Sequence, residues 1–142
     1  MTLLPINFTG VKPAQDFILD VGPYLFQVEK ADIEARPNGD GMRLACTSTV
    51  LLGPGLTRDN EHRKIFHNYN ISEKARPFIV RFFVACGIPD AHINASGGQL
   101  DTSWVLGKQF VGTNSHRKND ETGRVYNSLG SETPVTVIQD DI

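Results

Sequence analysis

Alternation of apolar and polar residues along the chain predicts five β-strands. The clearest case is residues 42–52, where the even positions are mostly apolar and the odd positions mostly polar. Side chains of a strand alternate between its two faces, so this pattern indicates one face toward a core and one toward solvent. The other strands are expected over residues 24–33, 64–71, 108–117 and 124–129.

A helix is expected between the third and fourth strands. Apolar residues recur there at spacings of three and four, and Gly87 and Pro89 then end the pattern. Its start is ambiguous, because Ser72 is a good N-cap and Pro77 suits a first helical turn. Residues 88–107 are predicted to be a loop with one short helical turn around Trp104. The helix residues expected in the core include Phe78, Phe82 and Phe83.

This order of elements predicts the fold class. A mainly β chain of three strands, one helix and two strands matches the five-stranded Greek-key barrel called the OB-fold, which often binds oligonucleotides. Other α+β barrels with the same elements remain open. We expect an N-terminal arm over residues 1–20, one domain over 21–130 and a flexible acidic tail over 131–142.

The third strand, KIFHNYNI, holds two aromatic residues that must point to opposite faces. Ile65, His67, Tyr69 and Ile71 share one face, which is the better candidate for the core. Phe66 then lies on the polar face, between Lys64 and Asn68. The fifth strand repeats this arrangement, with Tyr126 two residues after Arg124 and with Val125 and Leu129 on the opposite, inward face.

Exposed aromatic rings beside cationic side chains are typical of single-stranded nucleic-acid binding. Bases stack on such rings at roughly 1–3 kcal/mol each, and Lys and Arg neutralise phosphates. The alternative is that both rings are buried under the N-terminal arm or at an interface between copies of the chain. The predicted nucleic-acid-binding residues are Arg43, Lys64, Phe66, Asn68, Arg117, Lys118, Arg124 and Tyr126.

Charge is distributed unevenly along a chain whose net charge is −2. Residues 36–126 hold twelve Lys/Arg against eight Asp/Glu, whereas residues 1–35 hold two against five and residues 127–142 hold none against three. A basic middle between acidic ends fits a basic groove, although scatter over a solvated surface gives the same counts. We find no apolar run of membrane-spanning length and no signal peptide, and we therefore expect a cytoplasmic protein.

Neither the cysteines nor the histidines form a recognisable metal or catalytic motif. Cys46 and Cys86 lie in apolar surroundings and are expected to be buried free thiols. An HNH-like metal nuclease is an alternative for the histidines, but their spacing fits it poorly and His67 falls on the apolar strand face. No nucleotide-binding loop, nucleophile elbow or HExxH motif occurs. We predict no enzyme activity, no cofactor and no metal site.

The order of several short segments resembles the OB-fold single-stranded DNA-binding proteins encoded by bacteriophages. The resemblance spans roughly residues 21–130. It is carried by VGPYLFQVEKADI (21–33), the turn at Asn38-Gly39, LGPG (52–55), RKIFHNYNI (63–71), CGIP (86–89), LGK (106–108) and HRKNDETGRVYN (116–127).

This resemblance implies sequence-independent single-stranded DNA binding in phage replication or recombination, in the host cytoplasm. The chain ends in Asp140-Asp141-Ile142, an acidic and apolar ending similar to the tails with which such proteins recruit replication or recombination partners. Two readings compete with it, a phage structural or protein–protein interaction module and, more remotely, the nuclease. Salt dependence separates them, because strand binding weakens steeply with ionic strength.

Overall fold

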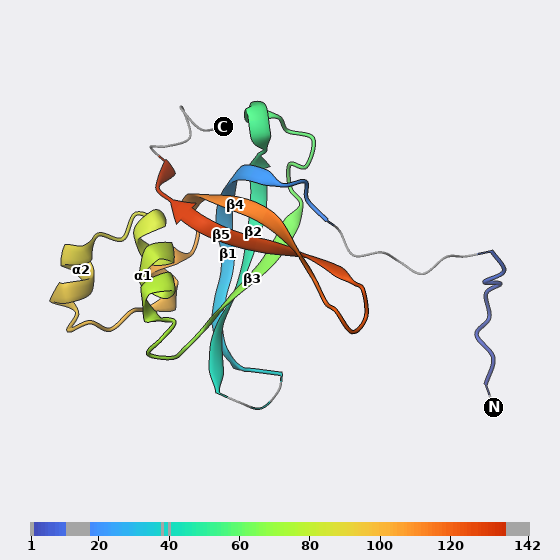
Figure 1. Ribbon diagram of the computed structural model, residues 1–142, viewed down its shortest axis with the longest axis horizontal. Helices are drawn as coiled ribbons and strands as arrows, with labels where there is room; N and C mark the ends of the chain where they lie inside the picture. The colour runs from blue at the N-terminus through green and yellow to red at the C-terminus, as the bar shows by residue number, and fades with distance from the viewer. Residues whose placement is uncertain (1, 11–17, 38, 40, 136–142) are drawn as a thin grey trace.

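The computed structural model describes residues 2–10, 18–37, 39 and 41–135, and this part of the chain is mainly β. Its five strands form one antiparallel sheet of order β3-β2-β1-β4-β5 (Figure 1). The strands are β1 (Gly22–Ala35), β2 (Met42–Leu52), β3 (Lys64–Asn70), β4 (Gln109–Lys118) and β5 (Val125–Thr133). The helical elements are η1 (Pro54–Leu56), α1 (Arg76–Ala85), α2 (Asp90–Ala95) and η2 (Thr102–Val105).

The long strand β1 organises the sheet. It pairs with β2 along most of its length, but with β4 only over Gly22–Gln27. The β4–β5 hairpin therefore branches from one end of β1 and crosses over the ribbon of the first three strands (Figure 1). The backbone ladder leaves β3 and β5 as edges and does not close between them. The mainly β architecture is confirmed, whereas barrel closure stays a prediction.

Most predicted elements are found close to their expected bounds. The second strand coincides with β2, and α1 lies between the third and fourth strands with Pro77 in its first turn. Gly87 ends the helical region at a positive φ of 90°, a conformation that glycine adopts without strain. The helical turn around Trp104 is confirmed as η2, but α2 lies within 88–107, which was wrongly predicted to be loop.

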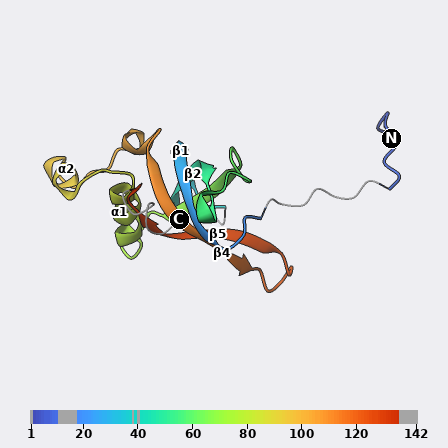
Figure 2. The same ribbon diagram turned by 90° about the horizontal axis from the view of Figure 1, so that it is seen from above.

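The core lies between the inner face of the sheet and α1. Views from the front and from above place α1 beside the sheet and α2 farther out (Figures 1 and 2). Phe26 and Phe110 pair across β1 and β4 with their rings 5.3 Å apart, and Phe82 from α1 meets Phe110 edge-on, also at 5.3 Å. Tyr69 stacks on the other side of this cluster, 5.0 Å from Phe82. Such contacts add to the stabilisation from burial alone.

Two of the helix residues predicted to lie in the core, Phe82 and Phe83, are buried, but Phe78 is 50% exposed. Phe78 lies one turn before Phe82 on the same helix face. The first turn of α1 therefore extends beyond the edge of the core, and the prediction for Phe78 was wrong. Ile71, expected on the core face with Ile65 and Tyr69, directly follows β3 and is 44% exposed, so that prediction was also wrong.

A buried hydrogen-bond chain connects the two edge strands. The Tyr69 hydroxyl donates to Glu132 Oε1 at 2.8 Å, and Arg81 Nε donates to Glu132 Oε2 at 3.0 Å. Because the Tyr69 proton is engaged, His67 Nδ1 must be the donor to Tyr69 Oη at 3.1 Å. His67 Nε2 then accepts from the Ser48 hydroxyl at 2.7 Å. The chain joins β2, β3, β5 and α1 through side chains.

Leu19, in the predicted N-terminal arm, is buried with the core. Its N–H donates to Asn127 Oδ1 at 2.9 Å, and its carbonyl accepts from Asn114 Nδ2 at 3.0 Å and His116 Nε2 at 2.6 Å. The folded domain thus includes Leu19, which lies before position 21, and strand β5 continues beyond position 130.

Both cysteines are buried free thiols, as predicted. Burial raises the pKa of each thiol to about 12, with smaller contributions from nearby acidic groups. Within the described ranges we find no helix that is long and apolar enough to cross a membrane. The predicted tail residues Asp140, Asp141 and Ile142 lie outside the described residues.

Candidate nucleic-acid interface

A cavity of about 320 Å³ lies between the first halves of β3 and β5. It is lined by Ile18, by Lys64–Phe66 and by Val125–Asn127. Three of the predicted site residues, Lys64, Phe66 and Tyr126, therefore meet in one place although they come from strands far apart in the sequence. We refer to this space as the ring cavity.

Phe66 is exposed because of the strand geometry. Its neighbours Ile65 and His67 are buried at 2% and 7% exposure, whereas Phe66 itself is 73% exposed. Its cross-strand partner is Thr47 on β2. The parity prediction is confirmed, and the described part of the chain leaves this ring accessible to a ligand.

Tyr126 is 40% exposed and lies opposite Arg117 in the β4–β5 ladder. The guanidinium carbon of Arg124 lies 5.7 Å from the centre of the Tyr126 ring, within the range of a cation–π contact. Val125, expected on the opposite, inward face, is itself 39% exposed. This end of the hairpin therefore projects beyond the core, and both of its faces are accessible.

The predicted cations do not form one patch. Lys64 lines the ring cavity, with its Nζ 3.2 Å from Glu29 Oε2. Arg43 donates from Nε to Glu34 Oε1 at 2.7 Å and lines neither the ring cavity nor the larger groove below. Lys118 is exposed at the end of β4 and lines neither of them.

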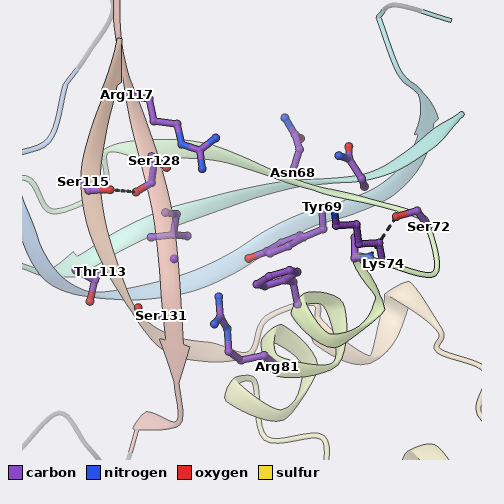
Figure 3. A pocket seen from close by; sticks show the side chains of 15 residues that line it. Asn68, Tyr69, Ser72, Lys74, Arg81, Thr113, Ser115, Arg117, Ser128 and Ser131 are labelled. Atoms are coloured by element: carbon purple, nitrogen blue, oxygen red, sulfur yellow. Dashed lines mark hydrogen bonds between the residues drawn. The ribbon is translucent and has the colours of Figure 1, made fainter. Parts of the chain in front are cut away.

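A larger groove, of about 670 Å³, continues along the second halves of β3 and β5 toward α1 (Figure 3). We call it the helix groove. Two predicted residues, Asn68 and Arg117, line it. Figure 3 shows the Arg117 side chain approaching from β4 and that of Arg81 from α1, with Tyr69 between them. The remaining lining is largely hydroxyl and amide groups, from Asn70, Ser72, Thr113, Ser115, Ser128 and Ser131.

Sequence reasoning missed three residues of the helix groove, Lys74, Phe78 and Arg81. Their spacing of four and three residues places them on one side of a helix and its preceding turn. A cation, an aromatic ring and a second cation on one stripe was a signal available in the sequence. It was overlooked because the apolar residues of the helix were all assigned to the core.

No known protein-family model matches this sequence, and no curated protein matches it. Among the described residues, no group of three or more His, Cys, Asp or Glu side chains is arranged to hold a metal ion. The case for a function therefore depends on the geometry of the ring cavity and the helix groove.

Proposed function

We propose that this protein binds single-stranded DNA without sequence preference, by stacking bases on aromatic rings and neutralising phosphates. The observation that carries the proposal is the ring cavity. Phe66 and Tyr126 come from different strands, are 73% and 40% exposed, and line one space together with Lys64. Every base offers a π-face, so two such rings bind a strand regardless of its sequence.

Single strands suit this cavity better than duplexes do. In a duplex the faces of the bases are covered by their neighbours, and a protein reaches only base edges in the grooves. A ring presented from the middle of a strand stacks only on a base that is already unstacked. The proposal therefore specifies single-stranded DNA, and the resemblance to phage proteins adds a role in replication or recombination.

An OB-fold is part of the same proposal. The strand order and the helix between β3 and β4 support it. Further support comes from the positions of the ring cavity and the helix groove. The ring cavity is lined by the earlier residues of both β3 and β5, and the helix groove by the later residues of both, so the two strands run side by side in the same direction. The Tyr69–Glu132 hydrogen bond also joins these two strands. We propose that side chains, rather than backbone pairs, close the barrel at this boundary.

The test is titration of fluorescently labelled poly-dT with the full chain and with the variants Phe66→Ala and Tyr126→Ala. Each variant is expected to bind roughly 5- to 150-fold more weakly, which corresponds to the loss of about 1–3 kcal/mol of stacking. Phe8→Ala is the matched control, because Phe8 is an exposed phenylalanine outside the ring cavity. Wild-type affinity in both variants would refute stacking at this site.

Salt and duplex controls decide the class of function. The logarithm of the affinity should fall with the logarithm of salt concentration, at a slope of about −0.7 for each phosphate contacted. A duplex of equal length should bind more weakly. If the wild-type chain binds no single strand at low salt, the proposal is wrong and an interaction module becomes the better hypothesis.

A further inference from the structure

The helix groove is lined by an exposed aromatic ring, Phe78, that is not buried in the core. Phe78 is 50% exposed, whereas Phe82, on the same face of α1, is fully buried. The Arg81 guanidinium carbon lies 5.3 Å from the centre of the Phe78 ring. This combination of a ring and a cation repeats that of Tyr126 and Arg124 in the β4–β5 hairpin. The two combinations lie on unrelated elements, a helix and a strand.

The charged side chains among the described residues that line the helix groove are all cations. Its lining includes Lys74, Arg81 and Arg117, and none of the described residues that line it is a carboxylate. Arg81 pairs with Glu132, whose side chain is 1% exposed and lies behind the groove wall. Neither Lys74 nor Arg117 forms a salt bridge with any residue in the described part of the chain. Cations that converge on a groove without carboxylates favour an anionic ligand.

The helix groove continues the ring cavity along the same two strands. Residues 64–66 and 125–127 line the ring cavity, and residues 68–70 and 128–131 line the helix groove. At about 3.3 Å per residue, Phe66 and Asn70 lie roughly 13 Å apart along β3. One extended strand of a few nucleotides is long enough to occupy both spaces.

We propose that the helix groove is a second base-stacking subsite of the same single-stranded DNA site. Phe78 holds a base, and Lys74, Arg81 and Arg117 hold the phosphates on either side of it. The strand then follows the boundary between β3 and β5, from Phe66 and Tyr126 to the start of α1. This inference rests on the proposed function and specifies the path of the bound strand.

The experiment is photo-crosslinking of dT12 that carries 5-iodo-deoxyuridine at single positions, followed by peptide mapping. Crosslinks are expected at Phe78 as well as at Phe66 or Tyr126, from different positions of one oligonucleotide. Crosslinks at the ring cavity without any near Phe78 would overturn the second subsite and leave the proposed function intact. An absence of binding by dT12 would instead overturn the proposed function.

Affinity measurements on variants test the same subsite independently. Phe78→Ala should weaken binding of dT12 by roughly 5- to 150-fold, and Phe78→Tyr, which retains a ring, should restore it. Lys74→Gln should reduce the slope of the salt dependence by about 0.7, the value for one phosphate contact. Lys30→Gln is the control, since Lys30 is an exposed lysine on β1 that lines neither space. Unchanged affinity in Phe78→Ala would refute the inference.

Discussion

The hydrogen bond between Tyr69 and Glu132 is the sharpest test of how the two edge strands are held together. Substituting Tyr69→Phe removes one oxygen atom and keeps the aromatic ring, which stacks on Phe82 at 5.0 Å. Burial and the Glu132 carboxylate raise the pKa of the Tyr69 phenol well above its ordinary value. The phenol therefore stays protonated and donates to Glu132 throughout the neutral range.

The expected cost follows from the two bonds that the oxygen makes. A hydrogen bond to a charged group contributes roughly 1.5–3 kcal/mol, and a buried donor left without an acceptor costs roughly 1–3 kcal/mol. Tyr69→Phe removes the hydrogen bond to the Glu132 carboxylate. It also leaves the buried His67 Nδ1–H without its acceptor, the Tyr69 oxygen. The Glu132 carboxylate keeps Arg81 as a partner, which limits the damage. We expect a net loss of about 2–4 kcal/mol in the free energy of unfolding.

Urea denaturation followed by circular dichroism measures this loss directly. In a thermal scan it corresponds to a fall in Tm of roughly 8–16 °C, at about 4 °C per kcal/mol for a domain of this size. Tyr126→Phe is the matched control, since it removes a hydroxyl from a 40% exposed ring and should change stability by less than about 0.5 kcal/mol. A Tyr69→Phe variant as stable as this control would refute the assigned hydrogen-bond chain.

Two further predictions concern buried titratable groups. Burial lowers the pKa of His67 to about 3, so between pH 6.5 and pH 3 the unfolded chain binds a proton that the folded protein does not. Stability should therefore be complete above pH 6.5 and fall by about 2 kcal/mol by pH 5, as measured by urea titration. A His67→Gln variant with the same loss would contradict this origin. Because the pKa values of Cys46 and Cys86 are about 12, neither thiol should react with Ellman's reagent at pH 8 until urea unfolds the protein. Rapid labelling of the native protein would show that a thiol is accessible.

Strand parity was the most reliable part of the sequence reasoning. A strand has only two faces, so the buried positions of Ile65 and Tyr69 were enough to place Phe66 outside. The bounds of β2 followed from the same alternation and the flanking glycines. These predictions needed no knowledge of which strands are neighbours.

Other elements gave weaker or misleading signals. Helix α2 has six residues, DAHINA, of which only Ile93 is buried, so no apolar period marks it. The end of β5 was missed because Gly130 and Ser131 interrupt the apolar pattern and the next buried residue, Glu132, is charged. A buried glutamate is tolerated here since Tyr69 and Arg81 bind it, and both are remote in the sequence.

Helix periodicity also cannot show where a helix leaves the core. Phe78 and Phe82 have the same spacing and chemistry as any pair on a core-facing stripe. What separates them is the position of the first turn of α1 beyond the edge of the sheet, which depends on tertiary packing. The candidate site was therefore only half predictable, because its strand residues follow from parity and its helix residues do not.

Under the proposed function, the pairing of charges, rather than their number, indicates where a DNA strand would lie. On the outer face of β1 and β2, away from both spaces, Arg43 is neutralised by Glu34. Arg117 has no salt bridge within the described part of the chain and lines a groove whose described residues include no carboxylate, so a phosphate does not have to displace an acidic partner among them. A protein with a net charge of −2 can thus present a cationic path. That path follows the boundary between β3 and β5 rather than crossing the face of β1 and β2.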